Sequence, residues 1–398
     1  MTPFTHVEMA PRDPILGLNE AYGSDTREHK VNLGVGVYYD ADGHVPLLRA
    51  VRAAEEARLG YLTPRGYLPI DGIAAYDAAV QRLLFGADSP LITERRVVTA
   101  QGLGGTGALK VGADFLKYLN PGAPVAISNP SWENHRGLFE AAGFKVVNYP
   151  YYDASSHGLD FAGMLSSLSG LPRGAVVVLH ACCHNPTGVD LDTAQWRQVV
   201  EVVRDKGLLP FLDIAYQGFG DGIEEDAEAV RLFADAGVPM LVASSFSKSF
   251  SLYGERVGAL SIVAASHEEA LRVQSQVKRV IRSNYSNPPT HGASVVSAVL
   301  HSDELRAMWH EELGQMRSRI RAMRLGLVER LKAHGVQADF DFIVRQRGMF
   351  SYSGLSSAQV DRLREEFAIY AVGTGRICVA ALNDRNIDAV AVAIAAVS

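Results

Sequence analysis

Seven short apolar runs alternate with helical patterns between residues 96 and 263, and this alternation constrains the fold more than any other feature. The runs are Arg96–Thr99, Pro124–Ser128, Lys145–Tyr149, Ala175–Leu179, Leu209–Asp213, Leu241–Ser245 and Gly258–Val263. Amphipathic stretches such as Ala108–Leu119 and Thr193–Lys206 lie between several of them. Strands that alternate with helices predict an α/β fold with a mainly parallel sheet. Nearly continuous apolar strands suit a sheet that helices bury on both faces.

The pattern changes after residue 302 and indicates a second, smaller α/β domain. A long charged helix is predicted over Asp303–His334, followed by a strand at Met349–Tyr352, a helix at Ser356–Phe367 and a strand at Ile377–Ala380. A chain of 398 residues is long enough for two or three domains. We expect an N-terminal arm at 1–11, a large domain at 47–315, and a small domain built from 12–46 and 316–398.

Composition and charge exclude several classes of partner. The chain is 47% hydrophobic and 21% charged, with a net charge of −6 and no block of basic residues, so neither nucleic acid nor a membrane surface is expected as a partner. Three cysteines are too few for a disulfide framework and fit a reducing compartment. Met1–Asp13 has no apolar signal core, and the longest apolar stretch, Ala389–Val397, is far shorter than a membrane span. We expect a soluble, cytoplasmic protein.

Lys248 stands at fixed distances from three other residues that suit one cofactor. Asp213 ends a strand-like run, Tyr216 follows it by three residues, and Arg256 follows Lys248 by eight. Pyridoxal phosphate chemistry needs an amine for a Schiff base, a carboxylate for the ring nitrogen, a phenol near the ring oxygen and an arginine for the phosphate. The four residues therefore predict pyridoxal phosphate as the cofactor.

Gly102–Gly107 matches the dinucleotide-binding pattern G-x-G-x-x-G and raises an alternative, a nicotinamide-dependent dehydrogenase. That pattern also requires an acidic residue at the end of the next strand to bind the ribose. Here the next strand closes with Asn129-Pro130 and no acid. A glycine-rich turn at a helix N-terminus still binds phosphate, so we assign this turn to the phosphate of the cofactor.

The run His180-Ala-Cys182-Cys183-His184 has a spacing that suggests a metal cluster. Adjacent cysteines are poor chelators of one tetrahedral ion, and Asn-Pro-Thr-Gly after them indicates a strand that ends in a turn. We therefore expect buried thiols and no metal.

At this point the motifs, in their order, resemble class I, fold-type I pyridoxal phosphate-dependent aminotransferases, in the aspartate and aromatic-amino-acid subgroup. They are Asn32–Tyr38, Gly105–Ala108, Asn129–His135, His184–Gly188, Asp213–Tyr216, Ser245–Lys248, Glu255–Gly258, Arg282–Pro289 and Gly375–Ala380. They span nearly the whole chain. Details such as Trp132-Glu-Asn-His135 and Ser251–Arg256 look most like the bacterial aromatic-amino-acid (tyrosine) aminotransferases.

The resemblance implies a role for each motif residue around the cofactor. Lys248 is expected to bind it covalently and to move the proton of the substrate, with Asp213 at the ring nitrogen and Tyr216 at the ring oxygen. The resemblance further implies Asn185 at the ring oxygen, Trp132 stacked on the ring, Gly105, Thr106, Ser245 and Arg256 at the phosphate, His135 in support of Asp213, and His180 beyond it.

The resemblance also implies a substrate site and a homodimer with shared active sites. Arg376 is expected to bind the α-carboxylate of the substrate through its planar guanidinium, with Gly36, Trp132 and Asn185 beside it. Arg282 is expected to reach the distal carboxylate of aspartate, glutamate or 2-oxoglutarate from a neighbouring subunit, and Tyr67 to reach the phosphate in the same way.

A few positions bear on the preferred amino donor, and they point to different substrates. Tyr39 replaces a lysine frequent in aspartate-selective enzymes of the family, and Gly104 replaces a serine, so both favour aromatic substrates, whereas Thr106 and Asn287 resemble the aspartate enzymes. The segment 63–66 departs from both patterns. We expect transamination of tyrosine, phenylalanine and aspartate with 2-oxoglutarate; the alternatives are a strictly aspartate-selective enzyme and, more remotely, a non-catalytic pyridoxal phosphate-binding protein.

Overall fold

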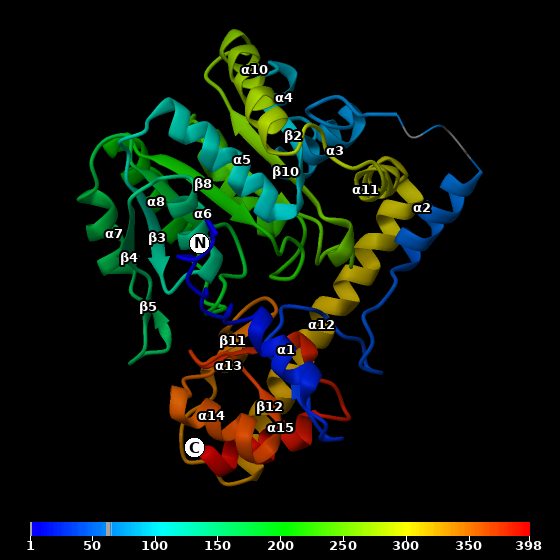
Figure 1. Ribbon diagram of the computed structural model, residues 1–398, viewed down its shortest axis with the longest axis vertical. Coiled ribbons are helices and arrows are strands. Elements are labelled where there is room, and N and C mark those ends of the chain that lie inside the picture. The colour runs from blue at the N-terminus through cyan, green and yellow to red at the C-terminus, as the bar shows by residue number, and fades with distance from the viewer. Residues whose placement is uncertain (1, 61–63, 65) are drawn as a thin grey trace.

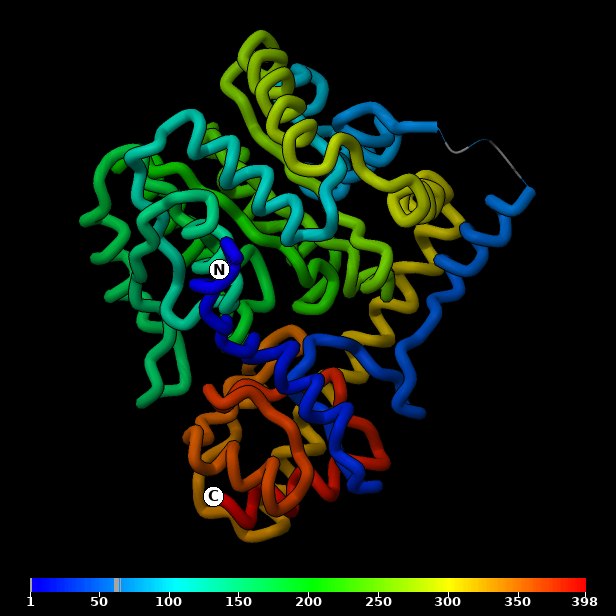
Figure 2. The backbone as a smooth tube through the Cα atoms, in the orientation of Figure 1, coloured from blue at the N-terminus to red at the C-terminus, as the bar shows by residue number. Residues whose placement is uncertain are grey.

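The computed structural model describes residues 2–60, 64 and 66–398. Two units, a large sheet body and a smaller C-terminal unit, are joined by the long helix α12 (Asp303–Ala333), which runs from one to the other (Figures 1 and 2). Thr63 and Arg65, in the segment that departs from the family patterns, lie outside the described residues.

A seven-stranded, mainly parallel sheet forms the large body, as predicted. Its strands, in spatial order, are β2 (Val97–Leu103), β10 (Val257–Val263), β9 (Met240–Ser245), β8 (Leu209–Ile214), β7 (Val176–His180), β3 (Val125–Asn129) and β4 (Val146–Pro150). β10 runs antiparallel to both of its neighbours, and the other pairs are parallel. The seven runs rich in β-branched residues are therefore the seven strands.

Helices cover both faces of this sheet and bury two separate apolar cores. One face packs against α5 (Gly104–Leu119), α6 (Glu133–Ala141) and α10 (His267–Asn284). The other packs against α3 (Ala74–Phe85), α7 (Phe161–Ser169), α8 (Thr193–Lys206), α9 (Glu228–Asp235) and α11 (His291–His301). The remaining elements of this body are α4 (Pro90–Thr93), β5 (Tyr152–Asp153), β6 (Gly158–Leu159), η1 (Glu225–Ala227) and η2 (Tyr253–Glu255).

The smaller unit combines segments from both ends of the chain. Its C-terminal elements are α13 (Phe342–Arg345), β11 (Phe350–Tyr352), α14 (Ser357–Phe367), β12 (Ile369–Tyr370), β13 (Arg376–Cys378), η3 (Val379–Ala381) and α15 (Ile387–Val397). From the N-terminal side come α1 (Leu16–Ser24) and β1 (Val31–Asn32). α2 (Arg49–Leu59) instead packs along α12 and against α11 of the sheet body. β1 pairs in parallel with β12, and β11 pairs antiparallel with β13. The prediction of a second, smaller α/β unit is confirmed, whereas the assignment of N-terminal residues to it and the exact boundaries remain predictions.

Local signals explain where several helices begin and end. Asp192 and Gln195 form a reciprocal capping box at the start of α8, which ends at Gly207 in the left-handed region. Ser356 and Gln359 form the same box at the start of α14. Within the described residues, no helix has both the length and the apolar character needed to cross a membrane.

Asp77 on α3 is a buried carboxyl group whose Oδ1 has no hydrogen-bond partner in the described part of the chain. Burial, and to a lesser degree the nearby charge of Asp71, raise its pKa to about 9 against the opposing effect of Lys278. The folded protein therefore keeps a proton that the unfolded chain releases near pH 4. Consequently, the contribution of this group to stability falls as pH rises from about 4 to about 9.

An Asp77→Asn variant should be more stable than the parent at neutral pH, because the amide copies the protonated carboxyl group without a pH dependence. We expect a gain of about 1–3 kcal/mol in the free energy of unfolding at pH 7 that shrinks toward pH 4. Chemical denaturation at pH 5, 7 and 9 would measure it. Asp88→Asn, at an exposed position nearby, is the matched control. Parallel pH profiles for Asp77→Asn and the parent would contradict the assignment.

Candidate active site

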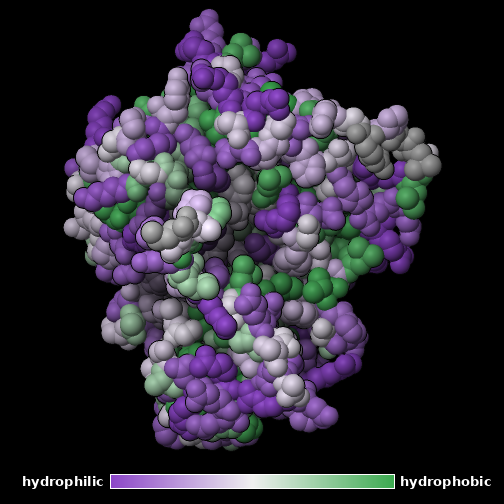
Figure 3. Space-filling model, viewed as in Figure 1, coloured by the Kyte–Doolittle hydropathy of each residue, from purple (hydrophilic) through white to green (hydrophobic). Residues whose placement is uncertain are grey.

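A cavity of about 660 Å³ lies between the sheet body and the C-terminal unit, beside the N-terminal segment that precedes α1. Figure 3 shows this face of the molecule hollowed between the two units. The cavity is lined by most of the predicted site residues, which are Gly36, Gly105, Thr106, Trp132, His180, Asn185, Asp213, Tyr216, Ser245, Lys248, Arg256 and Arg376. Many of them follow the carboxyl ends of parallel strands, where ligand sites of open α/β sheets occur.

A hydrogen-bonded chain fixes Asp213 at the end of β8. His135 donates from Nε2 to Oδ2 of Asp213 at 2.8 Å, and the Ser131 hydroxyl lies 2.9 Å from the other ring nitrogen of His135. Burial alone would raise the pKa of Asp213, but the hydrogen bond from His135 and nearby positive charge outweigh it, so its pKa lies below the ordinary value. The carboxylate is therefore ionised at neutral pH and can face a cationic group.

Lys248 lies in the loop after β9 and extends into the cavity. Its ammonium nitrogen lies 5.0 Å from the centre of the Tyr216 ring. Burial lowers the pKa of Lys248 to about 8, an effect that Asp213 opposes and Arg256 reinforces. A useful fraction of this amine is therefore uncharged near neutral pH, as a nucleophile or general base requires. Burial also raises the pKa of Tyr216, which keeps its phenol protonated.

Four groups of the cavity form a cradle suited to a phosphate. Helix α5 begins at Gly104, so the first backbone amides of this 16-residue helix lie at the cavity with the Thr106 hydroxyl. Ser245 ends β9, and Arg256 precedes β10, which pairs Gly258 with Ser245. Gly104 has φ +68°, and a Cβ there would lie 2.5 Å from a guanidinium nitrogen of Arg256, so glycine lets helix and guanidinium meet. Amides, hydroxyls and a guanidinium fit the phosphate of pyridoxal phosphate.

Arg376 is buried at the start of β13, and its guanidinium is held on two sides. Nη1 donates to Oδ1 of Asn185 at 3.1 Å, and Nη2 donates to the carbonyl of Gly34 at 2.6 Å. The guanidinium carbon lies 4.3 Å from the centre of the Phe350 ring. Nε has no hydrogen-bond partner among the described residues. A buried arginine with a free donor at a cavity wall is suited to a carboxylate ligand.

His180 ends β7 beside the Asp213 chain, as predicted. Its ring lies 4.9 Å from that of His135, and neither of its nitrogens has a hydrogen-bond partner in the described part of the chain. Burial lowers the pKa of His180 to about 3, so the ring is neutral. It adds an uncharged polar group to the cavity wall.

Two predicted residues do not line the cavity of their own chain. Tyr67 is 97% exposed, and Arg282 is exposed at the end of α10. The prediction that both act from a neighbouring subunit therefore stays a prediction. The expected absence of a metal also stays a prediction. The side chains of Cys182, Cys183 and Asp226 lie close together. However, Asp226 already accepts hydrogen bonds from three backbone amides, those of Gly218, Gly220 and Asp221.

Sequence reasoning missed three groups that shape the cavity. Phe350 covers the Arg376 guanidinium, the carbonyl of Gly34 accepts from it, and the Tyr253 hydroxyl accepts from the backbone amide of Tyr38. Phe350 stands on β11, which pairs with β13, so it is a diagonal neighbour of Arg376 across the two strands. Antiparallel pairing of the two predicted strands is the signal that could have found it.

Comparison with known proteins identifies the family to which this fold and this cavity belong. Residues 28–394 match the model of the family described as aminotransferase class I and II, and this chain belongs to that family. It is 68% identical over 394 residues to an aspartate aminotransferase of Pseudomonas aeruginosa, with 99% of each chain covered, and 53% identical over 397 residues to an aromatic-amino-acid aminotransferase of Escherichia coli, with 99% of this chain and all of that one covered.

A solved structure is equally similar. An aromatic-amino-acid aminotransferase from Burkholderia pseudomallei, covalently bound to pyridoxal phosphate, is 72% identical to this chain, with both chains fully covered and a TM-score of 0.98. The alternative of a nicotinamide-dependent dehydrogenase does not agree with membership of this family.

Proposed function

We propose that this chain is a pyridoxal phosphate-dependent aminotransferase that moves the amino group of tyrosine, phenylalanine and aspartate to 2-oxoglutarate. One observation carries the proposal: the Lys248 amine, the Asp213 carboxylate and the Arg256 phosphate cradle come from the ends of three adjacent strands and meet in one cavity. Relatives named for aspartate and for aromatic amino acids support both substrate classes.

The residues of the chain divide into those that hold the cofactor and those that act on the substrate. Pyridoxal phosphate, when bound, supplies an aldehyde that reacts with amines and a ring that accepts the electrons left when the substrate loses its α-proton. Gly105, Thr106, Ser245 and Arg256 would hold its phosphate, Trp132 would stack on its ring, and Asn185 and Tyr216 would donate to its ring oxygen. Asp213, oriented by His135, would hold its ring nitrogen in the protonated form.

Lys248 is the proposed general base and acid. Its Nζ would anchor the cofactor. It would also take the proton from the α-carbon of the substrate and deliver it to the neighbouring carbon of the cofactor. A pKa near 8 lets the same amine accept and release a proton close to neutral pH. The amino acid leaves as a 2-oxo acid, and 2-oxoglutarate then collects the amino group, so we expect ping-pong kinetics.

Arg376 would fix the α-carboxylate of every substrate, with Gly36, Trp132 and Asn185 beside it. Since Asn185 and Phe350 already hold the guanidinium in place, little side-chain entropy is lost when a carboxylate binds.

We further propose a homodimer in which Tyr67 and Arg282 complete the site of the partner copy, with the domain boundaries given above. The exposure of both side chains on one chain supports this arrangement. The three cysteines are free and buried, which supports a cytoplasmic location.

The substrate range is tested by kcat/KM for aspartate, tyrosine and phenylalanine with 2-oxoglutarate, measured on one preparation. Comparable values are expected for the dual-specificity enzyme. A preference for aspartate of about 10³-fold, or ~4 kcal/mol in transition-state free energy, would instead mean a strictly aspartate-selective enzyme.

Arg282 distinguishes the two kinds of substrate. Its contact among the described residues is a hydrogen bond to Ser286, and no ion pair there holds it, so it is free to turn toward solvent when an aromatic ring enters. We expect Arg282→Ala to lower kcat/KM about 10²-fold for aspartate, because a charged hydrogen bond is lost, and only a few-fold for phenylalanine. Arg279→Ala, exposed on the same helix, is the control. Equal losses on both substrates would contradict the movement.

A further inference from the structure

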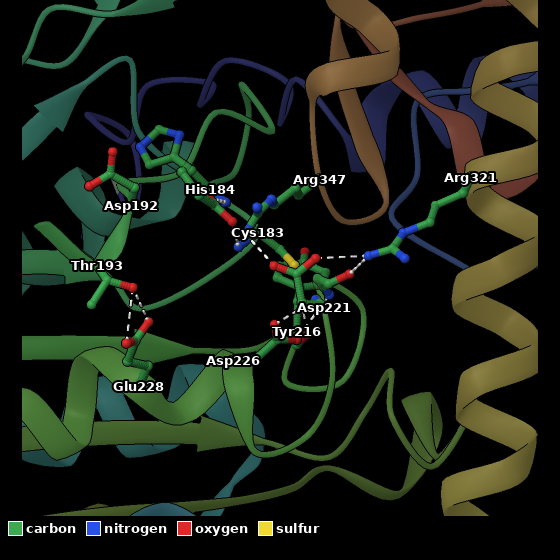
Figure 4. A network of polar contacts seen from close by, with 12 residues as sticks. Cys183, His184, Asp192, Thr193, Tyr216, Asp221, Asp226, Glu228, Arg321 and Arg347 are labelled. Atoms are coloured by element: carbon green, nitrogen blue, oxygen red, sulfur yellow. Dashed lines mark hydrogen bonds and ion pairs between the residues drawn. The ribbon is translucent and has the colours of Figure 1, made fainter. Parts of the chain in front are cut away.

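A second cavity, of about 490 Å³, lies away from the active site between α12, the loop that follows Tyr216, and the segment that leads into β11. Its lining includes Arg317, Arg321, Arg324, Arg345 and Arg347. Figure 4 shows Arg321 on α12 and Arg347 on the other segment reaching toward Asp221 of the loop. We refer to this space as the arginine cavity.

The arginine cavity has an excess of positive charge. None of its lining residues is acidic. The nearest ionic partner in the described part of the chain is Asp221, which Arg321 contacts at 2.8 Å and Arg347 at 2.6 Å. One carboxylate thus serves two guanidinium groups, and three more line the same space. Asp190 also lies near enough to feel the charge of Arg347, but the lining itself carries five positive charges and no negative one.

The five guanidinium groups differ in how many of their nitrogens already donate hydrogen bonds to the protein. Arg324 is buried and donates to three backbone carbonyls, so it has a structural role. Arg317 donates through Nη1 alone, to the carbonyl of Gly218, and keeps its other nitrogens. Arg345 is exposed and makes no side-chain hydrogen bond or ion pair with any described residue. Several donors therefore remain for a ligand.

Arg321 and Arg347 converge on one carboxylate from two different elements, and this is the arrangement in which guanidinium groups bind an oxyanion. Planar guanidinium groups bind carboxylate and phosphate oxygens in pairs. A concave space of this volume is large enough for a small ligand. A single carboxylate neutralises only part of the charge, so a ligand with several negative charges is favoured.

We propose that the arginine cavity binds a small polyvalent oxyanion of the phosphate class, such as pyrophosphate. Arg317 and Arg345 would hold it together with Arg321 and Arg347, the two arginines that pair with Asp221. Binding at this site does not require that the chain catalyse the proposed transamination. The ligand would compete with Asp221 for Arg321 and Arg347.

The position of the arginine cavity connects it to the active site. Arg317 and Arg321 donate to the carbonyls of Gly218 and Gly220, in the loop directly after Tyr216. On the other side, Arg347 precedes Phe350, which covers the Arg376 guanidinium. A bound oxyanion would therefore tie the loop after Tyr216 to the strand that carries Phe350.

The test is calorimetric titration of the cofactor-loaded enzyme with pyrophosphate at low, constant ionic strength. The parent should bind one pyrophosphate per chain at this site. Arg345→Gln removes a positive charge without breaking a described contact and should weaken binding about tenfold. Asp221→Asn removes the competing carboxylate and should tighten binding about tenfold. Arg306→Gln, on α12 outside the cavity and paired with Asp303, should leave the Kd unchanged.

The opposite signs of the two effects separate this site from others. A variant that merely folded badly would bind more weakly, so tighter binding by Asp221→Asn has no such explanation. Equal Kd values in all four proteins would place the bound pyrophosphate elsewhere and overturn the proposal. Weaker binding by Asp221→Asn, or no binding by the parent, would overturn it as well.

Discussion

A Lys248→Ala variant should lose at least about 10⁴-fold in kcat, the largest effect expected of any single change in this chain. The variant loses both the covalent anchor of the cofactor and the amine that moves the α-proton, and proton transfer by a positioned group alone contributes about 10²–10⁴-fold. The phosphate cradle and Asp213 remain, so the variant should still bind pyridoxal phosphate non-covalently. Single-turnover kinetics with aspartate would measure the loss.

Two readouts distinguish a chemical role of Lys248 from a structural one. Borohydride reduction followed by mass spectrometry should attach the cofactor to Lys248 in the parent and to no residue in the variant. A small amine added to the solution should restore part of the activity, because it can take over the proton transfer. A variant that keeps more than about 1% of the parental kcat without added amine would show that another group is the base.

Asp213→Asn should lower kcat/KM about 10²–10⁴-fold, since removal of one charge from a buried pair costs about 3–5 kcal/mol. The amide is close in size to the carboxyl group and can still accept a hydrogen bond from His135. What it loses is the negative charge that would hold the ring nitrogen of the cofactor in its protonated form. Steady-state kinetics on the cofactor-saturated variant would measure the loss.

The control for Asp213 uses a cofactor whose charge does not depend on the protein. Pyridoxal phosphate methylated at the ring nitrogen carries a permanent positive charge, so it should bring the variant and the parent closer together. An equal deficit with both cofactors would mean that Asp213 acts through the shape of the site rather than through its charge.

The sequence predicted the seven strands, and most of the site residues that it predicted line the cavity, because both depend on local patterns. Apolar runs show which segments are buried, and the spacing around Lys248 follows from the chemistry of one cofactor. The same patterns carry no information on the direction of a strand, so the reversal of β10 between β2 and β9 was not predicted. The reversal matters because it brings Arg256, which precedes the antiparallel strand β10, to the same sheet edge as Ser245, which ends the parallel strand β9.

Contacts between distant segments were the other part that the sequence could not predict. Phe350 and the carbonyl of Gly34 meet Arg376 only after strands from both ends of the chain have packed together. The arginine cavity likewise joins residues that are scattered along the sequence, so no spacing marked it. The roles proposed for Tyr67 and Arg282 involve a second chain, about which local patterns say nothing.

The parallel pairing of β1 with β12 has a consequence for biosynthesis. Val31 leaves the ribosome well before its partner Ile369, which lies 338 residues later in the chain. At about 5–20 residues per second, the N-terminal strand waits on the order of tens of seconds for a partner. The sheet body can assemble during this interval, whereas the smaller unit closes only after β12 has been made. The synthesis of β12 thus sets the earliest time at which the newly made protein can complete the wall of its cavity.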